Sequence, residues 1–243
     1  MNININVEQD YQSLSRKAAQ IFAQKIKENP TAAFGFATGS SPIGMYKELV
    51  RMHKEEGLDF SGITAFNLDE YHPISRESEH SYYYFMQEHL FSHVNINQSK
   101  INIPDGTAKD IEAECRNYEA KITEAGGIVA QILGIGLNGH IGFNEPAEYF
   151  ESKTRYAPLA EVTLKANAQH FNNPDDMPRN ALTMGIKAIM MAKNIILLAN
   201  GEAKASIIKD ALTGAITPLV PASALQLHPS VSVVLDKEAA ALL

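Results

Sequence analysis

A cluster of polar side chains on a glycine-rich segment carries the strongest chemical signal in the sequence. Asn138, His140, Asn144 and Glu145 lie within eight residues, directly after the apolar run Ile128–Ile135. A histidine beside a carboxylate can transfer protons, because the carboxylate fixes the imidazole tautomer and stabilises its charged form. We therefore interpret His140 and Glu145 as a general acid–base pair, with a purely structural histidine as the alternative.

Two adjacent carboxylates form a second candidate site. Asp69 and Glu70 follow the apolar run Ile63–Leu68, where a carboxylate is well placed to act as a general base. Adjacent side chains point in different directions, so only one of the two is expected to face a site. The alternative is that one of them caps the next structural element.

The turn Thr38-Gly39-Ser40-Ser41-Pro42 joins an apolar run to a predicted helix that opens at Pro42. Free N–H groups and the dipole at a helix start favour an anion such as phosphate. The alternative is an ordinary turn with a serine cap, and the ending of a Walker loop is missing. Lys204, which follows another apolar run, could also reach a phosphate.

Alternating apolar runs and helix-period segments must position these residues. The predicted strands are Asn4–Val7, Ala32–Thr38, Ile63–Leu68, Ile128–Ile135, Ala181–Met184, Ile195–Ala199 and Val231–Leu235. The predicted helices are Tyr11–Lys27, Pro42–Glu56, Ser78–His93, Ala108–Ala125 and Glu202–Leu212. This alternation predicts an α/β fold with a mostly parallel sheet flanked by helices. Ligands of such sheets bind at the carboxyl ends of the strands, which is where all the candidate residues fall.

Composition narrows the function further. The 243 residues are 45% hydrophobic and 20% charged, as in globular proteins, and no linker divides residues 1–243, so we expect a single domain. The net charge of −7 argues against a nucleic-acid partner. We expect no membrane association, because no apolar run approaches the ~20 residues of a membrane span and there is no signal-peptide pattern.

The cysteine and histidine residues give expectations about the cellular compartment and about metal binding. A single cysteine, Cys115, fits a reducing cytoplasm and is a poor nucleophile candidate. His80, His89 and His93 lack metal-binding spacing, so we predict no metal site.

Taken together, the motifs resemble the glucosamine-6-phosphate deaminase (isomerase) family. The matching segments, in family order, are Ala37–Pro42, Phe66–Tyr71, Leu133–Pro146, Lys153–Arg155, Ala181–Gly185, Gly201–Lys204 and Pro221–His228. The resemblance implies a modified Rossmann-type fold and a phosphosugar substrate. The sequence leaves the choice between a monomer and a homo-oligomer open. It also implies that glucosamine 6-phosphate and water become fructose 6-phosphate and ammonia in amino-sugar catabolism, without a cofactor.

The resemblance also implies roles for particular residues. His140 would handle the proton that opens the sugar ring, with Glu145 and Asn138 orienting it. Asp69 would take the proton from C2, with Glu70 as the alternative base. The turn Thr38–Ser41 and Lys204 would hold the phosphate.

Three positions depart from the family pattern. Asn138 stands where many members have Asp, and Ala157 stands where long, allosterically activated members have Lys. Gln169, followed by His170, replaces an expected phosphate-binding Arg. We therefore expect Lys204 and the Thr38–Ser41 turn to hold the phosphate, with His170 or Arg155 assisting.

Three alternative functions remain open at this stage. The first is a galactosamine 6-phosphate deaminase, whose substrate differs from glucosamine 6-phosphate in one hydroxyl. A 6-phosphogluconolactonase on the same fold would not need the whole set of Asp69, His140 and Glu145. A sugar-phosphate-sensing module of a transcription regulator would need a DNA-binding domain, which the strand predicted at Asn4–Val7 and the acidic charge disfavour.

Overall fold

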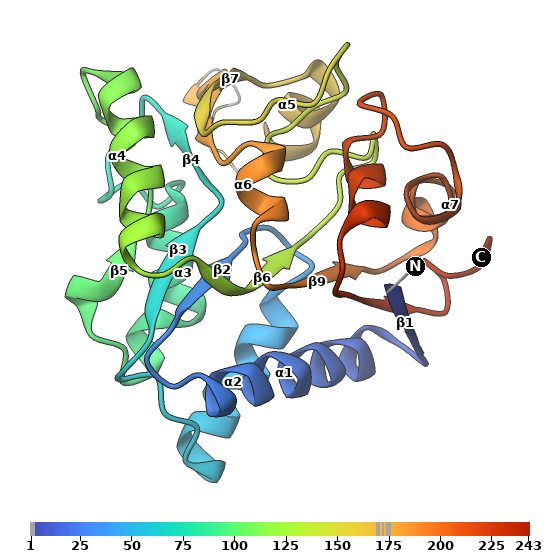
Figure 1. Cartoon of the computed structure of the whole chain (residues 1–243), viewed down its shortest axis with the longest axis horizontal. Helices are drawn as coiled ribbons and strands as arrows, with labels where there is room; N and C mark the ends of the chain where they lie inside the picture. The colour runs from blue at the N-terminus through green and yellow to red at the C-terminus, as the bar shows by residue number, and fades with distance from the viewer. Residues whose placement is uncertain (1–2, 169–170, 172, 174–175) are drawn as a thin grey trace.

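A parallel sheet forms the centre of the computed structural model, which describes residues 3–168, 171, 173 and 176–243 (Figure 1). Within these residues the sheet has seven strands in the order β1-β10-β9-β6-β2-β3-β5, and all neighbouring pairs are parallel. The strands are β1 (Ile3–Glu8), β2 (Ala33–Phe36), β3 (Thr64–Asn67), β5 (Ile101–Asn102), β6 (Ile128–Leu133), β9 (Asn194–Ala199) and β10 (Val231–Asp236). The predicted fold class is confirmed.

Helices cover both faces of this sheet. Phe22 of α1 (Tyr11–Glu28) packs edge-on against Phe34 and Phe36 of β2, with ring centroids 5.3 and 5.4 Å apart. Tyr118 of α4 (Ile111–Glu124) packs against Phe66 of β3 at 5.8 Å. The register pairs Phe66 with Gly35, so these two residues share a face of the sheet. Phe34 and Phe36 point to the other face because successive side chains alternate, so α1 and α4 lie on opposite faces. Cover on both faces explains why β2 and β6 are buried along their whole length.

Strand order reverses between β2 and β6. From β2 the chain adds β3 and β5 on one side, and from β6 it adds β9 and β10 on the other. The loops that leave the carboxyl ends of β2 and β6 therefore diverge, which opens a crevice between them. The turn Thr38–Ser41 and the segment 134–146 both lie at this reversal.

A smaller sheet lies beyond the carboxyl end of β3. Its strands run antiparallel in the order β4 (Asp69–His72), β8 (Asn180–Thr183) and β7 (Arg155–Pro158). The strand predicted at Ala181–Met184 corresponds to β8, which begins and ends one residue earlier. It belongs to this antiparallel sheet and not to the parallel one. The sequence did not predict β4 and β7, because four residues that mix charged and apolar side chains do not alternate clearly. A second apolar core packs here, made of Tyr71, Phe143, Leu159, Phe171, Met177 and Ala181.

The helices differ from the sequence prediction mainly at their ends. The region predicted as Ser78–His93 is α-helical only over α3 (Tyr82–His89) and ends in a 3₁₀ turn at Phe91–His93. The Ser81 side chain caps the start of α3 by accepting the Tyr84 N–H at 3.0 Å. The region Glu202–Leu212 begins as a 3₁₀ turn at Glu202–Lys204 and continues as α7 (Ala205–Thr213). Helix α2 (Ile43–Glu56) matches its prediction, while α5 (Glu161–Ala168), α6 (Ile186–Met190) and β5 were not predicted. None of the helices in the described ranges is both long and apolar enough to cross a bilayer.

Replacing Gly106 with alanine should destabilise the protein. A Cβ at Gly106 would lie 2.6 Å from the Ile74 carbonyl oxygen and 2.7 Å from that of Tyr71, and backbone cannot move aside cheaply. We expect Gly106→Ala to lower the free energy of unfolding by about 1–3 kcal/mol, measured by urea denaturation. Gly134→Ala, where a Cβ meets open space, is the matched control. Equal stability of the two variants would contradict this account of Gly106.

Candidate active site

A cavity of about 620 Å³ opens where the strand order reverses. It is lined by residues from the carboxyl ends of β2, β3, β6 and β9, together with α3 and α5. Most of the predicted site residues line it, namely Thr38, Gly39, Ser40, Ser41, Asp69, Asn138, His140 and Lys204. Residues far apart in the sequence therefore meet at one place, as expected for the switch point of an α/β sheet.

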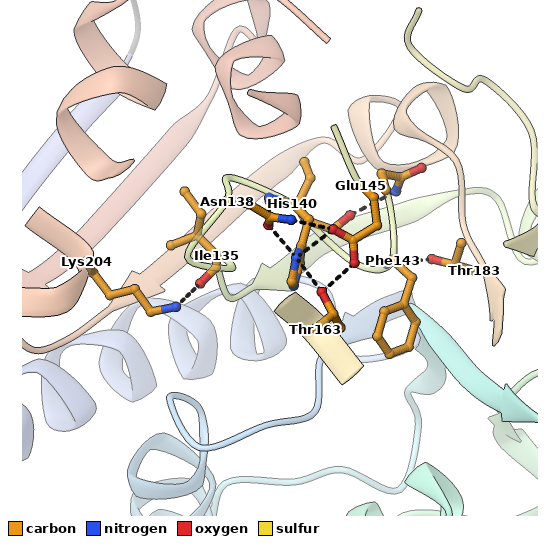
Figure 2. A network of polar contacts seen from close by, with 10 residues as sticks. Ile135, Asn138, His140, Phe143, Glu145, Thr163, Thr183 and Lys204 are labelled. Carbon is orange, nitrogen blue, oxygen red and sulfur yellow. Dashed lines mark hydrogen bonds and ion pairs between the residues drawn. The ribbon is translucent and has the colours of Figure 1, made fainter. Parts of the chain in front are cut away.

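Glu145 lies behind His140 and belongs to a compact polar network (Figure 2). Asn138 Nδ2 donates to Glu145 Oε2 at 2.6 Å, and Asn138 Oδ1 lies 2.8 Å from His140 Nδ1. Glu145 Oε2 is itself 3.3 Å from His140 Nδ1. Thr163 of α5 donates its hydroxyl to Glu145 Oε1 at 2.5 Å. The carboxylate thus has donors on both oxygens.

These contacts determine which imidazole nitrogen carries the proton. A carboxylate can only accept hydrogen bonds, so the amide nitrogen of Asn138 must face Glu145 and its oxygen must face His140. His140 Nδ1 then donates, which leaves Nε2 of the neutral ring as an acceptor. A Cβ at Gly136 would lie 2.2–2.5 Å from the His140 ring, so glycine is needed there for the ring to pack in this place.

Opposing effects act on the charge of Glu145. Burial raises the pKa of its carboxyl, but the hydrogen bond and charge of His140, with the bonds from Thr163 and Asn138, outweigh burial and lower the pKa to about 2. Glu145 is therefore a stable anion beside the imidazole. This arrangement holds the imidazole ring in place.

Asp69 and Glu70 take different roles, as their adjacency suggested. Asp69 lines the cavity and is only 6% exposed. Burial raises the pKa of its carboxyl well above the ordinary value, and the charge of Glu70 raises it further. A carboxylate in such a place is a stronger base than one in water.

Glu70 instead holds backbone and caps α3. It accepts the N–H groups of Tyr71 and Tyr82 at 2.9 Å and that of Tyr83 at 3.0 Å. Burial raises the pKa of Glu70 to about 7, although these three bonds act to lower it. The capping alternative is thus correct for Glu70, and it places Tyr82 at the cavity wall.

The cavity lining also contains an amine and the hydroxyl groups of the turn after β2. The turn Thr38–Ser41 lines the cavity, and Ser41 donates its hydroxyl to Asn200 Oδ1 at 3.1 Å. Lys204 Nζ reaches the same region and donates to the Ile135 carbonyl oxygen at 2.6 Å (Figure 2). Burial lowers the pKa of Lys204, because a charged amine loses solvation there. A bound anion would restore the lost interactions of this amine.

Arg155 and His170, the two residues expected to assist in phosphate binding, have different outcomes. Arg155 is not among the lining residues, and it donates to Asn144 Oδ1 at 2.7 Å near Glu151. It therefore braces the 134–146 segment, and its predicted role as a phosphate ligand is wrong. Gln169 and His170 lie outside the described residues.

The comparisons with known proteins agree with the geometry. The family model "Glucosamine-6-phosphate isomerases/6-phosphogluconolactonase" matches residues 6–234. The chain is 52% identical over 239 residues to the glucosamine-6-phosphate deaminase of Alkaliphilus oremlandii, covering 98% of this chain and 99% of that protein. It is 50% identical over 234 residues to that of Thermoanaerobacter pseudethanolicus, covering 96% and 92%. The chain belongs to this isomerase/lactonase family.

Solved structures of the isomerase/lactonase family include both kinds of member. A monomeric glucosamine-6-phosphate deaminase superposes with a TM-score of 0.96 at 46% identity, covering 99% of this chain and all of that one. The 6-phosphogluconolactonase of Thermotoga maritima has a TM-score of 0.73 at 17% identity, covering 97% of this chain and 100% of that one. The second likeness shows the fold alone.

Some polar contacts of this family member could not be found from the motifs. Thr163 and Asn167 come from α5, where Asn167 donates to the Tyr71 hydroxyl at 2.9 Å. Asn200 directly follows β9, a position that could have drawn attention because strand ends carry ligands in this fold. Thr163 has no such signal.

Two other expectations concern metal and thiol chemistry. Within the described ranges, no three His, Cys, Asp or Glu side chains are grouped so that they could hold a metal ion. Burial raises the pKa of the Cys115 thiol to about 11, which keeps it protonated and unreactive.

The Thr163 hydroxyl should contribute to stability in a pH-dependent way. Because the pKa of Glu145 falls from an ordinary 4.5 to about 2 in the folded chain, its ionisation stabilises the fold above about pH 4.5. This contribution is lost as the pH falls toward 2. We expect Thr163→Val to lower the free energy of unfolding by about 1–3 kcal/mol at pH 7.

The difference in the free energy of unfolding between Thr163→Val and the unaltered protein should shrink in denaturant titrations as the pH is lowered from about 4.5 toward 2. Thr163→Ser keeps the hydroxyl and is the control. If the loss in free energy of unfolding of Thr163→Val did not change with pH, the hydroxyl would not act through the Glu145 anion.

Proposed function

We propose that the chain is a glucosamine-6-phosphate deaminase, which converts glucosamine 6-phosphate and water to fructose 6-phosphate and ammonia. The observation that carries the proposal is one cavity with a basic carboxylate, Asp69, and a carboxylate-backed imidazole, His140. Lys204 and the Thr38–Ser41 turn line the same cavity. Relatives about half identical over nearly the whole chain, named as this deaminase, support the substrate.

Ring opening is assigned to His140. Nε2 of the neutral ring accepts the proton of the C1 hydroxyl and delivers it to the ring oxygen as the C1–O5 bond breaks. Glu145 stabilises the imidazolium that forms in between, and Asn138 holds the ring tautomer. The product is the open-chain aldehyde of the amino sugar.

Isomerisation is assigned to Asp69. Its carboxylate takes the proton from C2, and the electrons of the C2–H bond form a C1–C2 enolamine as the C1 oxygen gains a proton. The protonated Asp69 then gives this proton to C1, which leaves an iminium group at C2. Water adds to C2, and ammonia leaves to give fructose 6-phosphate.

The phosphate is assigned to the turn Thr38–Ser41 and to Lys204. We further propose that residues 1–243 work as one domain in the cytoplasm. The family likeness to a monomeric deaminase supports a monomer, which size-exclusion chromatography would test. The direct test of the function is the joint release of ammonia and fructose 6-phosphate from glucosamine 6-phosphate. Hydrolysis of 6-phosphogluconolactone without ammonia release from the amino sugar would overturn the proposal.

Removing the base should abolish proton exchange at C2. We expect Asp69→Asn to fold normally. Because an amide has no useful basicity, this variant should show no deuterium incorporation at C2 in heavy water. Mass spectrometry of the recovered sugar gives the readout. Exchange at the unaltered rate in Asp69→Asn would place the base elsewhere. Glu70→Gln is the comparison, because Glu70 holds backbone and should retain measurable exchange.

Removing the Lys204 amine should weaken phosphosugar binding strongly. A phosphate dianion would then be held by neutral donors, which costs on the order of 2–4 kcal/mol in kcat/KM. Kinetics with glucosamine 6-phosphate and with glucosamine would measure the loss. Lys209→Ala, on the exposed face of α7, is the matched control. If kcat/KM of Lys204→Ala fell equally for both sugars, the role of Lys204 would not be phosphate binding.

A further inference from the structure

Asp236, the last residue of β10, lies outside the cavity lining but holds the turn that leads to Lys204. Its side chain is buried, with 6% of the residue exposed. Both carboxylate oxygens accept the backbone N–H of Gly201, at 3.1 and 2.9 Å. Oδ1 also accepts the N–H of Ala239 at 2.8 Å. The Asp236 carboxylate thus binds backbone N–H groups at the end of the central sheet.

The turn at Gly201 needs such a constraint. The pairing of β10 with β9 ends at Leu235 and Ala199, so beyond this point the Asp236 side chain takes over from the strand ladder. Gly201 has φ 84° and ψ 152°, a backbone region that only glycine enters readily. Such a conformation persists when the surrounding structure fixes it. The bonds from Asp236 supply that fixation.

The turn connects three strand ends around the cavity. Asn200, just before Gly201, accepts the hydroxyl of Ser41 from the turn that follows β2. The Gly201 carbonyl accepts the Lys204 N–H at 3.0 Å, which starts the 3₁₀ turn. Lys204 then reaches the Ile135 carbonyl oxygen beyond the end of β6. A shift of Gly201 would move both Asn200 and Lys204 relative to the cavity.

We propose that Asp236 is a positioning residue for phosphate binding, acting through Gly201 on Asn200 and Lys204. The inference rests on the proposed function, because it assigns the Lys204 end of the cavity to the substrate phosphate. A role in stability alone would lower the melting temperature and leave the affinity for phosphate unchanged. A positioning role changes KM and leaves kcat largely intact.

The experiment compares Asp236→Ala, Asp236→Asn and Val234→Ala. In Asp236→Ala, KM for glucosamine 6-phosphate and the inhibition constant of inorganic phosphate should both rise about tenfold, with kcat changing less than about threefold. Asp236→Asn keeps one acceptor oxygen and should show a smaller rise in both constants. Val234→Ala removes buried contacts from the same strand without touching the Gly201 bonds, so it should lower thermal stability at unchanged KM.

Unchanged KM and phosphate inhibition in Asp236→Ala would overturn the inference. So would a loss confined to kcat, or an equal rise of KM in Val234→Ala. If Asp236→Ala does not fold, the same comparison of Asp236→Asn with Val234→Ala decides. If the unaltered protein releases no ammonia, the proposed function fails. Calorimetric binding of inorganic phosphate to the same variants then still tests Asp236.

Discussion

Between β2 and β6 the chain reverses the direction in which it adds strands, and the site depends on this reversal. The two loops that leave these strands turn away from each other, so the sheet itself opens the cavity and no packed side chains have to be displaced. Parallel strand direction brings the carboxyl ends of β2, β3, β6 and β9 to the same edge. The small antiparallel sheet then covers one side and carries Asp69 on its first strand.

The surroundings of two carboxylates shift their pKa values in opposite directions: Asp69 is buried in the cavity lining, and Glu145 is half-buried behind His140. Glu145 has donors on both oxygens and a pKa of about 2, so it remains an anion that supports His140. Asp69 has the charge of Glu70 nearby and a pKa raised by burial, so it holds a proton more readily. Such divergence is a common way for one site to separate electrostatic support from base catalysis. The same divergence supports the two roles proposed for Glu145 and Asp69.

The sequence predicted the parts of the site that are local in the chain. The glycine-rich segment with Asn138, His140 and Glu145 and the turn after β2 could be located because polar residues directly follow apolar runs. The choice between Asp69 and Glu70 needed the structure, since it depends on α3 lying over Glu70. The short strands β4 and β7 carry too few residues for a periodic signal, and their pairing with β8 is a tertiary effect. Contacts such as those of Thr163 and Asp236 come from distant elements, so no spacing rule reveals them.

An amide at Asn138 resolves a charge conflict that an aspartate would create. Asn138 donates to Glu145 at 2.6 Å and accepts from His140, a combination that no ionised side chain can provide. An aspartate in the same place would put two carboxylates at hydrogen-bonding distance, and one of them would have to take up a proton or move away. With Asn138, a single negative charge at Glu145 faces the imidazole. The contact of His140 Nδ1 with Asn138 Oδ1 fixes the tautomer of the ring. The proposed ring opening therefore depends on the orientation of His140.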